Sequence, residues 1–104
     1  MLAEATGSPK FVAEIFSDRS INDVVQLAGE IVALEASVAA LATADGKIVL
    51  ARSGGIDFDA GRVLRAAIEP LGGRGGGRPE FAQGALPTER ISEALASVQR
   101  AAEH

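Results

Sequence analysis

The sequence predicts a single small α/β domain of the α+β-like kind, in which about three helices pack on one mixed β-sheet. Three observations support this fold class. The chain has 104 residues, a length typical of one domain. Its hydrophobic fraction is 47% and it contains no cysteine, so a hydrophobic core and not a set of disulfides must hold it together. The apolar pattern changes repeatedly between the period of a strand and that of a helix.

The first predicted elements are a strand and a helix, after a loose segment over residues 1–9. Residues 10–16 alternate between two partly apolar faces, as in a sheet covered on at least one side. Ser20 and Asp23 have the spacing of a capping box. The apolar residues that follow them recur every three or four positions: Ile21, Val24, Val25, Ala28, Ile31 and Val32. We expect this helix to lie on the sheet.

A hairpin comes next in the chain. Asp45-Gly46 is typical of a two-residue hairpin turn, which predicts antiparallel strands over residues 38–43 and 47–52. Asp57 or Asp59 can then cap a second helix. The predicted buried stripe of that helix is Ala60, Val63, Leu64, Ala67, Ile68 and Leu71.

Two arginines and a proline also belong to this predicted second helix. Arg62 and Arg65 are expected to point to solvent, and Pro70 to strain or end the last turn. A third helix is predicted over residues 88–102, with an apolar face of Ile91, Leu95, Val98 and Ala102. The domain core therefore extends over residues 10–102.

Between the last two helices lies the stretch LGGRGGGRPEFAQGAL, residues 71–86, with five glycines and two arginines among its first eight residues. Glycine at this density suggests a flexible linker, or a loop whose main chain has positive φ or lies against something. A linker does not need the apolar Phe81, Ala82 and Leu86. We therefore predict a tight glycine-rich loop followed by a short strand that returns to the sheet.

Such a loop can expose successive backbone N–H groups to an anion, and its arginines can add phosphate contacts. A triphosphate-binding P-loop is excluded because the Lys-Ser/Thr pair is absent. A dinucleotide fingerprint is excluded because a helix, not a strand, precedes the glycines.

Charge is unevenly distributed in this chain. The formal net charge is −4, which by itself argues against a nucleic-acid partner. Residues 47–78, however, hold six basic and three acidic residues, a local balance of +3. A local attractive field can therefore exist within an acidic domain, although scattered surface charges explain the count equally well.

No constellation of catalytic residues is evident. His104 is the sole histidine and lies at the C-terminus, while Ser8, Ser53 and Thr88 have no local base. Asp57 and Asp59 are more readily explained as helix caps than as a catalytic pair. We therefore predict a binding module without catalytic residues, metal or cofactor, and the cytosol is its default compartment because the chain lacks cysteine, a signal peptide and a membrane span.

Leu71 to Gln83, LGGRGGGRPEFAQ, resembles the glycine-rich signature of the DHHA1 domain in its alanyl-tRNA synthetase form. The resemblance covers the chain from Lys10 to about Ala102. It implies a mixed sheet with packed helices and a C-terminal module of the type in alanyl-tRNA synthetases and alanyl-tRNA editing proteins, which grips tRNA and supports aminoacylation and editing by a larger protein. Whether that parent is a synthetase or a free-standing editing protein stays open. DHH phosphoesterases usually carry Gly-Gly-Gly-His where this chain has Gly-Gly-Gly-Arg, which favours the tRNA branch.

The resemblance also implies a set of nucleic-acid-binding residues. The glycines would shape the loop, the arginines would contact phosphates or bases, and the glutamine would hydrogen-bond nearby. The set is Gly72, Gly73, Arg74, Gly75, Gly76, Gly77, Arg78, Pro79 and Gln83. The implied partners are tRNA or another nucleic acid and the missing parent domains, with no membrane, and a homodimer stays open.

Two alternatives belong to other functional classes. The chain could be the substrate-binding lobe of a DHH-family phosphoesterase acting on short oligonucleotides or cyclic dinucleotides. It could instead be a protein-interaction module with an Ala-rich surface on the third helix. The glycines could also have a purely structural role, namely to let the preceding helix pack closely on the sheet.

Overall fold

The computed structural model describes residues 10–34, 37–54, 56 and 58–102. The strands and α-helices are β1 (Lys10–Phe16), α1 (Ile21–Leu34), β2 (Ser37–Thr43), β3 (Lys47–Arg52), α2 (Ala60–Ile68), β4 (Arg74–Gly77), β5 (Phe81–Ala85) and α3 (Ile91–Ala102). Two short 3-10 helices, η2 (Glu69–Leu71) and η3 (Thr88–Arg90), follow α2 and precede α3. The predicted α/β class with one mixed sheet and three helices is confirmed.

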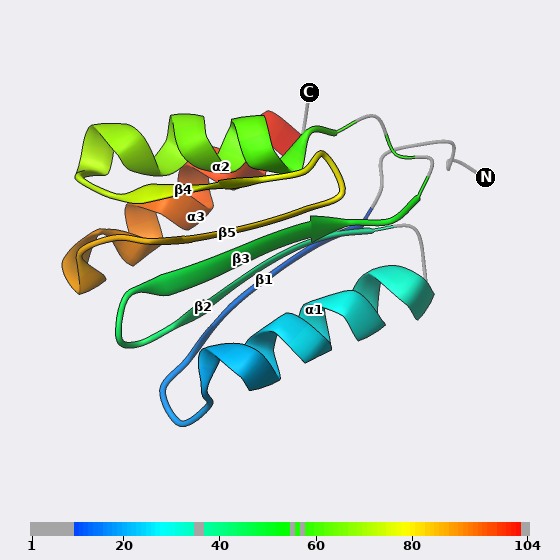
Figure 1. The fold of residues 1–104 in the computed structure, drawn as a ribbon, viewed down its shortest axis with the longest axis horizontal. Coiled ribbons are helices and arrows are strands. Elements are labelled where there is room, and N and C mark those ends of the chain that lie inside the picture. The colour runs from blue at the N-terminus through cyan, green and yellow to red at the C-terminus, as the bar shows by residue number, and fades with distance from the viewer. Residues whose placement is uncertain (1–9, 35–36, 55, 57, 103–104) are drawn as a thin grey trace.

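The five strands form one sheet in the order β1-β2-β3-β5-β4. The β1–β2 pair is parallel and is joined by α1, while the other pairs are antiparallel. Helix α1 covers one face of the sheet, and α2 and α3 cover the other (Figure 1). A parallel pair needs a long crossover, which is why a helix separates β1 from β2 and a short turn separates β2 from β3.

Each face of the sheet has its own hydrophobic core. Along β2, Ala39 and Leu41 pack toward α1, while Val38, Ala40 and Ala42 pack toward α2 and α3. Every residue of β2 is buried, as expected for a strand covered on both faces. Helix α1 packs on β2 and β3, and α2 packs on β4 and β5. The β4–β5 part of the sheet is consequently left open on the α1 side.

The predicted helix signals act as helix caps. Ser20 Oγ accepts a hydrogen bond from Asp23 N at 3.3 Å, and Asp59 Oδ1 accepts one from Arg62 N at 3.1 Å. Asp57, the other candidate cap, lies outside the described residues. Helix α2 tightens into η2 at Pro70, and Gly72 follows with φ of 89°.

The β2–β3 hairpin differs from its prediction in one detail. Three residues, 44–46, connect the strands where Asp45-Gly46 predicted a two-residue turn. Gly46 has φ of 97°, which suits the three-residue loop that ends in a left-handed glycine. The Thr43 hydroxyl donates to the Asp45 carboxylate, so the turn gains a side-chain bond that the dipeptide pattern does not specify.

The third helix is also present as predicted. It starts as η3 and becomes α-helical at Ile91, which is buried together with Leu95 and Val98. In the described part of the chain, no helix has the length and apolar character needed to cross a membrane.

Candidate nucleic-acid interface

The glycine-rich segment forms an edge strand, not a loop. β4 pairs antiparallel with β5, with Gly77 opposite Ala82, and a tight turn joins them. At this turn Arg78 N donates to Phe81 O at 2.8 Å and Phe81 N donates to Arg78 O at 3.3 Å. The predicted strand after the glycines is confirmed as β5. The loop was predicted wrongly because glycine density was interpreted as turn chemistry, whereas here it permits close packing.

Close packing explains most of these glycines. A Cβ built on Gly75 would lie 2.7 Å from Gly84 Cα, and one on Gly77 would lie 2.4 Å from Phe81 O. From the other side, a Cβ on Gly61 of α2 would lie 2.7 Å from Gly77 O. Strand β5 can therefore approach β4 closely because Gly75 and Gly77 have no side chain, and helix α2 can approach it because Gly61 has none.

The structure does not form the expected anion-binding loop. Within the described part of the run, only Gly72 has positive φ. In an extended strand successive N–H groups point to opposite edges, so those of β4 cannot converge on one anion. The N-terminal N–H groups of α2 are also occupied, since Ala60 N donates to Pro79 O at 2.8 Å and Gly61 N to Arg78 O at 3.1 Å. The backbone therefore forms no converging anion site here, and the exposed arginine side chains are the candidate phosphate contacts.

The strand register places basic and polar side chains on the sheet face that α1 leaves open. Directly opposite residues of neighbouring strands lie on the same face, so Ala85 is flanked by Lys47 on β3 and Arg74 on β4. Gln83 is flanked in the same way by Val49 and Gly76. Both Arg74 and Gln83 are exposed.

Arg78 follows Arg74 after about 13 Å of extended chain, at the turn end of the hairpin. It is exposed as well. Helix α2 adds a third guanidinium, because an Arg65 side-chain nitrogen lies 3.1 Å from the position of a Cβ on Gly76. Arg65 was predicted to point to solvent, and its side chain is exposed, but it also reaches the edge strand.

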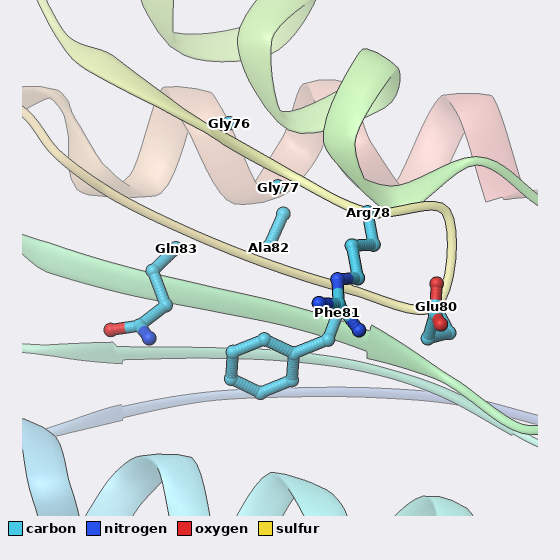
Figure 2. Close-up of a pocket in the computed structure, with 7 residues that line it drawn as sticks. All are labelled: Gly76, Gly77, Arg78, Glu80, Phe81, Ala82 and Gln83. Atoms are coloured by element: carbon cyan, nitrogen blue, oxygen red, sulfur yellow. The ribbon is translucent and has the colours of Figure 1, made fainter.

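The hairpin itself lines a shallow cavity of about 350 Å³. Of the predicted binding residues, four meet there: Gly76, Gly77, Arg78 and Gln83. Glu80, Phe81 and Ala82 complete the lining. Figure 2 shows the Phe81 ring and the Gln83 side chain projecting from β5 on its α1 side, while Gly76 and Gly77 lie on the neighbouring strand β4. Sequence reasoning left Phe81 out, although strand alternation at positions 81 and 83 could have placed it on this face.

The other predicted binding residues lie elsewhere. Gly73 is buried, since a Cβ there would lie 2.7 Å from Leu86 Cβ. Gly72 lies at the far end of β4, and Gly75 packs between β5 and Ile68. Pro79 lies in the turn, where its carbonyl also accepts a hydrogen bond from Arg52 Nε at 3.1 Å. Arg52 thus holds the turn against β3.

One pKa shift occurs near this face. The Thr43 hydroxyl and, to a lesser degree, the charge of Lys47 hold the pKa of Asp45 below its ordinary value of 3.8. Lys47 Nζ lies 3.4 Å from Asp45 Oδ2, and both side chains are exposed. Among the described residues, no three His, Cys, Asp or Glu side chains gather as a metal site.

The DHHA1 domain family matches residues 7–104, nearly the whole chain. The chain belongs to the DHHA1 domain family. The DHHA1 chain is 42% identical to an alanine–tRNA ligase of Methanoculleus marisnigri over 80 residues, which is 75% of this chain and 9% of the ligase. It is 51% identical to the ligase of Bacillus subtilis over 41 residues, 38% of this chain and 5% of that protein. The DHHA1 chain spans less than a tenth of these ligases.

Two solved structures share the DHHA1 fold. The C-Ala domain from Aquifex aeolicus alanyl-tRNA synthetase superposes with a TM-score of 0.84 at 23% identity, with all of both chains covered. RecJ from Thermus thermophilus, solved in complex with Mg²⁺, gives a TM-score of 0.79 at 22% identity over 96% of this chain and 16% of RecJ. At these identities the likeness shows the fold alone.

Proposed function

We propose that this DHHA1 domain binds tRNA as an accessory domain of an alanine–tRNA ligase and supports aminoacylation and editing by the rest of that protein. The observation that carries the proposal is the open, side-chain-poor face of the β4–β5 hairpin, bordered by Lys47, Arg74 and Arg78. Its ligase relatives supply the class of partner. This role places the domain in the cytoplasm.

The physical case starts from charge. Guanidinium groups bind phosphate oxygens through charge-assisted and bidentate hydrogen bonds. The hydrogen bonds of the described residues include none from the Arg74 or Arg78 side chain to another described group, so both remain able to bind a ligand. The bare backbone between them lets a nucleic-acid chain approach the sheet closely. A small basic patch on an acidic domain predicts modest, salt-sensitive affinity.

Binding of a folded tRNA transcript by arginine variants tests this function. Arg74→Ala and Arg78→Ala are each expected to weaken binding by about 1–3 kcal/mol without lowering stability, because each removes a charge-assisted contact at an exposed site. Fluorescence anisotropy with labelled tRNA measures the effect. Arg100→Ala is the matched control, since Arg100 is exposed on α3 and its side chain donates to Ser97 Oγ.

The phosphoesterase lobe is the competing function, and the fold likeness to RecJ is the observation that favours it. A cyclic dinucleotide and an unstructured RNA of equal length therefore serve as competitors in the same assay. Unchanged tRNA binding in the Arg74→Ala/Arg78→Ala double variant would refute this interface. Displacement by the cyclic dinucleotide alone would favour the phosphoesterase lobe.

A further inference from the structure

We propose that the cavity on the β4–β5 hairpin holds one unstacked nucleobase of the bound RNA, which stacks on the ring of Phe81. This inference rests on the proposed function for the nature of the ligand. It goes beyond that function because a grip on phosphates needs only the arginines, whereas the cavity contains an aromatic ring and polar groups suited to a base.

Phe81 supplies a stacking surface. It pairs across the sheet with Ala51, and it packs against the α1-side core while remaining partly exposed. Phe81 lines the cavity together with Gly76 and Gly77. Its ring projects from β5 on the α1 side, with the Arg78 side chain nearby (Figure 2). Bases stack readily on exposed aromatic side chains, and such stacking is largely independent of base identity because every base has a π-face.

Gln83 supplies the hydrogen bonds that stacking lacks. It follows two residues after Phe81 on the same strand, so both side chains lie on one face. Its amide has donors and an acceptor, and among the described residues it has no hydrogen-bond partner. An amide can bond a donor or an acceptor on a base edge, so little preference among the four bases is expected.

The size and charge of the cavity agree with a single base. A volume of about 350 Å³ lies at the lower end of the range for small-ligand sites, which suits one base and not a dinucleotide. Arg78 at the turn provides donors for the adjoining phosphate or a base oxygen. Glu80 at the same turn offers only acceptors, which disfavours a phosphate inside the cavity itself.

Two measurements test the base site. First, titration of the domain with adenosine monophosphate is followed by NMR, with ribose 5-phosphate as the ligand that lacks only the base. We expect the nucleotide to shift the Gln83 side-chain amide and the Gly76 and Gly77 amide signals through ring currents. Ribose 5-phosphate should leave the Gln83 side chain unshifted.

Second, tRNA affinity is compared between Phe81→Leu and Phe16→Leu. Both replacements keep an apolar side chain against the α1-side core, but Phe16 lies on β1, two strands beyond β3 from the hairpin strand β5. Phe81→Leu should weaken tRNA binding about 5- to 150-fold and Phe81→Tyr should restore it, while Phe16→Leu binds as wild type.

The outcomes separate this inference from the proposed function. If the wild-type domain binds tRNA but Phe81→Leu binds it equally well, the base site is wrong and the arginine interface stands. The base site would also be wrong if Phe81→Leu and Phe16→Leu lost tRNA affinity equally. The same holds if ribose 5-phosphate caused the NMR shifts that adenosine monophosphate causes. If the wild type fails to bind tRNA, the proposed function fails, and the NMR titration alone then decides the cavity.

Discussion

At the scale of single residues, the glycines of β4 differ in what they permit. Gly75 and Gly77 face backbone atoms at distances that no Cβ can tolerate, whereas a Cβ on Gly76 would meet the mobile end of Arg65 at 3.1 Å. None of the three has positive φ. The requirement for glycine at positions 75 and 77 therefore comes from neighbouring atoms and not from backbone conformation.

This difference predicts opposite outcomes for two adjacent substitutions. Gly77→Ala should lower the free energy of unfolding by about 1–3 kcal/mol, because its methyl group would overlap Phe81 O and Ala82. Gly76→Ala should change the free energy of unfolding by less than about 1 kcal/mol, because the Arg65 side chain can move and because alanine lowers the conformational entropy of the unfolded chain. Urea denaturation measures both. Equal losses in the two variants would contradict the packing explanation.

The fold lowers the pKa of the Asp45 carboxyl group. The folded-state pKa is lowered from 3.8, so the ionised carboxylate stabilises the turn above that pH, and this contribution disappears as the pH falls through the folded-state pKa. An NMR titration of the carboxyl carbon should give a midpoint below 3.8. Thr43→Val should raise the midpoint more than Lys47→Gln does, because the Thr43 hydrogen bond is the larger cause. The reverse order would contradict this assignment.

At the scale of elements, side-chain hydrogen bonds fix where helices and strands join. Ser53 Oγ donates to Val32 O of α1 at 2.6 Å and accepts from Ser37 N of β2 at 2.9 Å. Ser53 is buried, and it connects the end of β3 to two other elements. Arg52 holds β3 to the β4–β5 turn through Pro79 O. The open hairpin face is therefore anchored on the covered part of the sheet.

Ser53→Ala should lower the free energy of unfolding by about 1–3 kcal/mol, because it leaves a partly buried carbonyl and a buried N–H without this hydroxyl. Thermal or urea unfolding measures the loss. Ser92→Ala is the control, since Ser92 is exposed on α3 and should change stability by less than about 0.5 kcal/mol. An unchanged free energy of unfolding in Ser53→Ala would show that other groups or water replace the hydroxyl.

At the scale of the whole molecule, the distribution of charge bears on the proposed binding of a polyanion. The chain is acidic overall at −4, yet Lys47, Arg65, Arg74 and Arg78 lie around one hairpin. For the RNA binding proposed above, acidic residues on other faces would repel the polyanion and favour its approach to the hairpin.

Salt dependence should reveal the size of this patch. If two to four of its cations neutralise phosphates, tRNA affinity should fall about 10- to 150-fold between 50 and 200 mM salt. The Arg74→Ala/Arg78→Ala variant should show a shallower slope of log K against log salt. Anisotropy titrations at several salt concentrations give both slopes. Identical slopes would mean that these arginines neutralise no phosphate.

The sequence by itself determined the fold class, the three helices, the strands other than β4 and two helix caps. It could do so because the apolar period and the capping residues Ser20 and Asp59 act through local chemistry. It also determined family membership through the glycine-rich stretch. Only the tertiary structure decided what those glycines do. Their neighbours are α2 and β5, brought in by strand order, and no local pattern encodes that contact. The same pairing brings Arg74, Arg78 and Phe81 to one open face, because register, not sequence distance, sets which side chains meet.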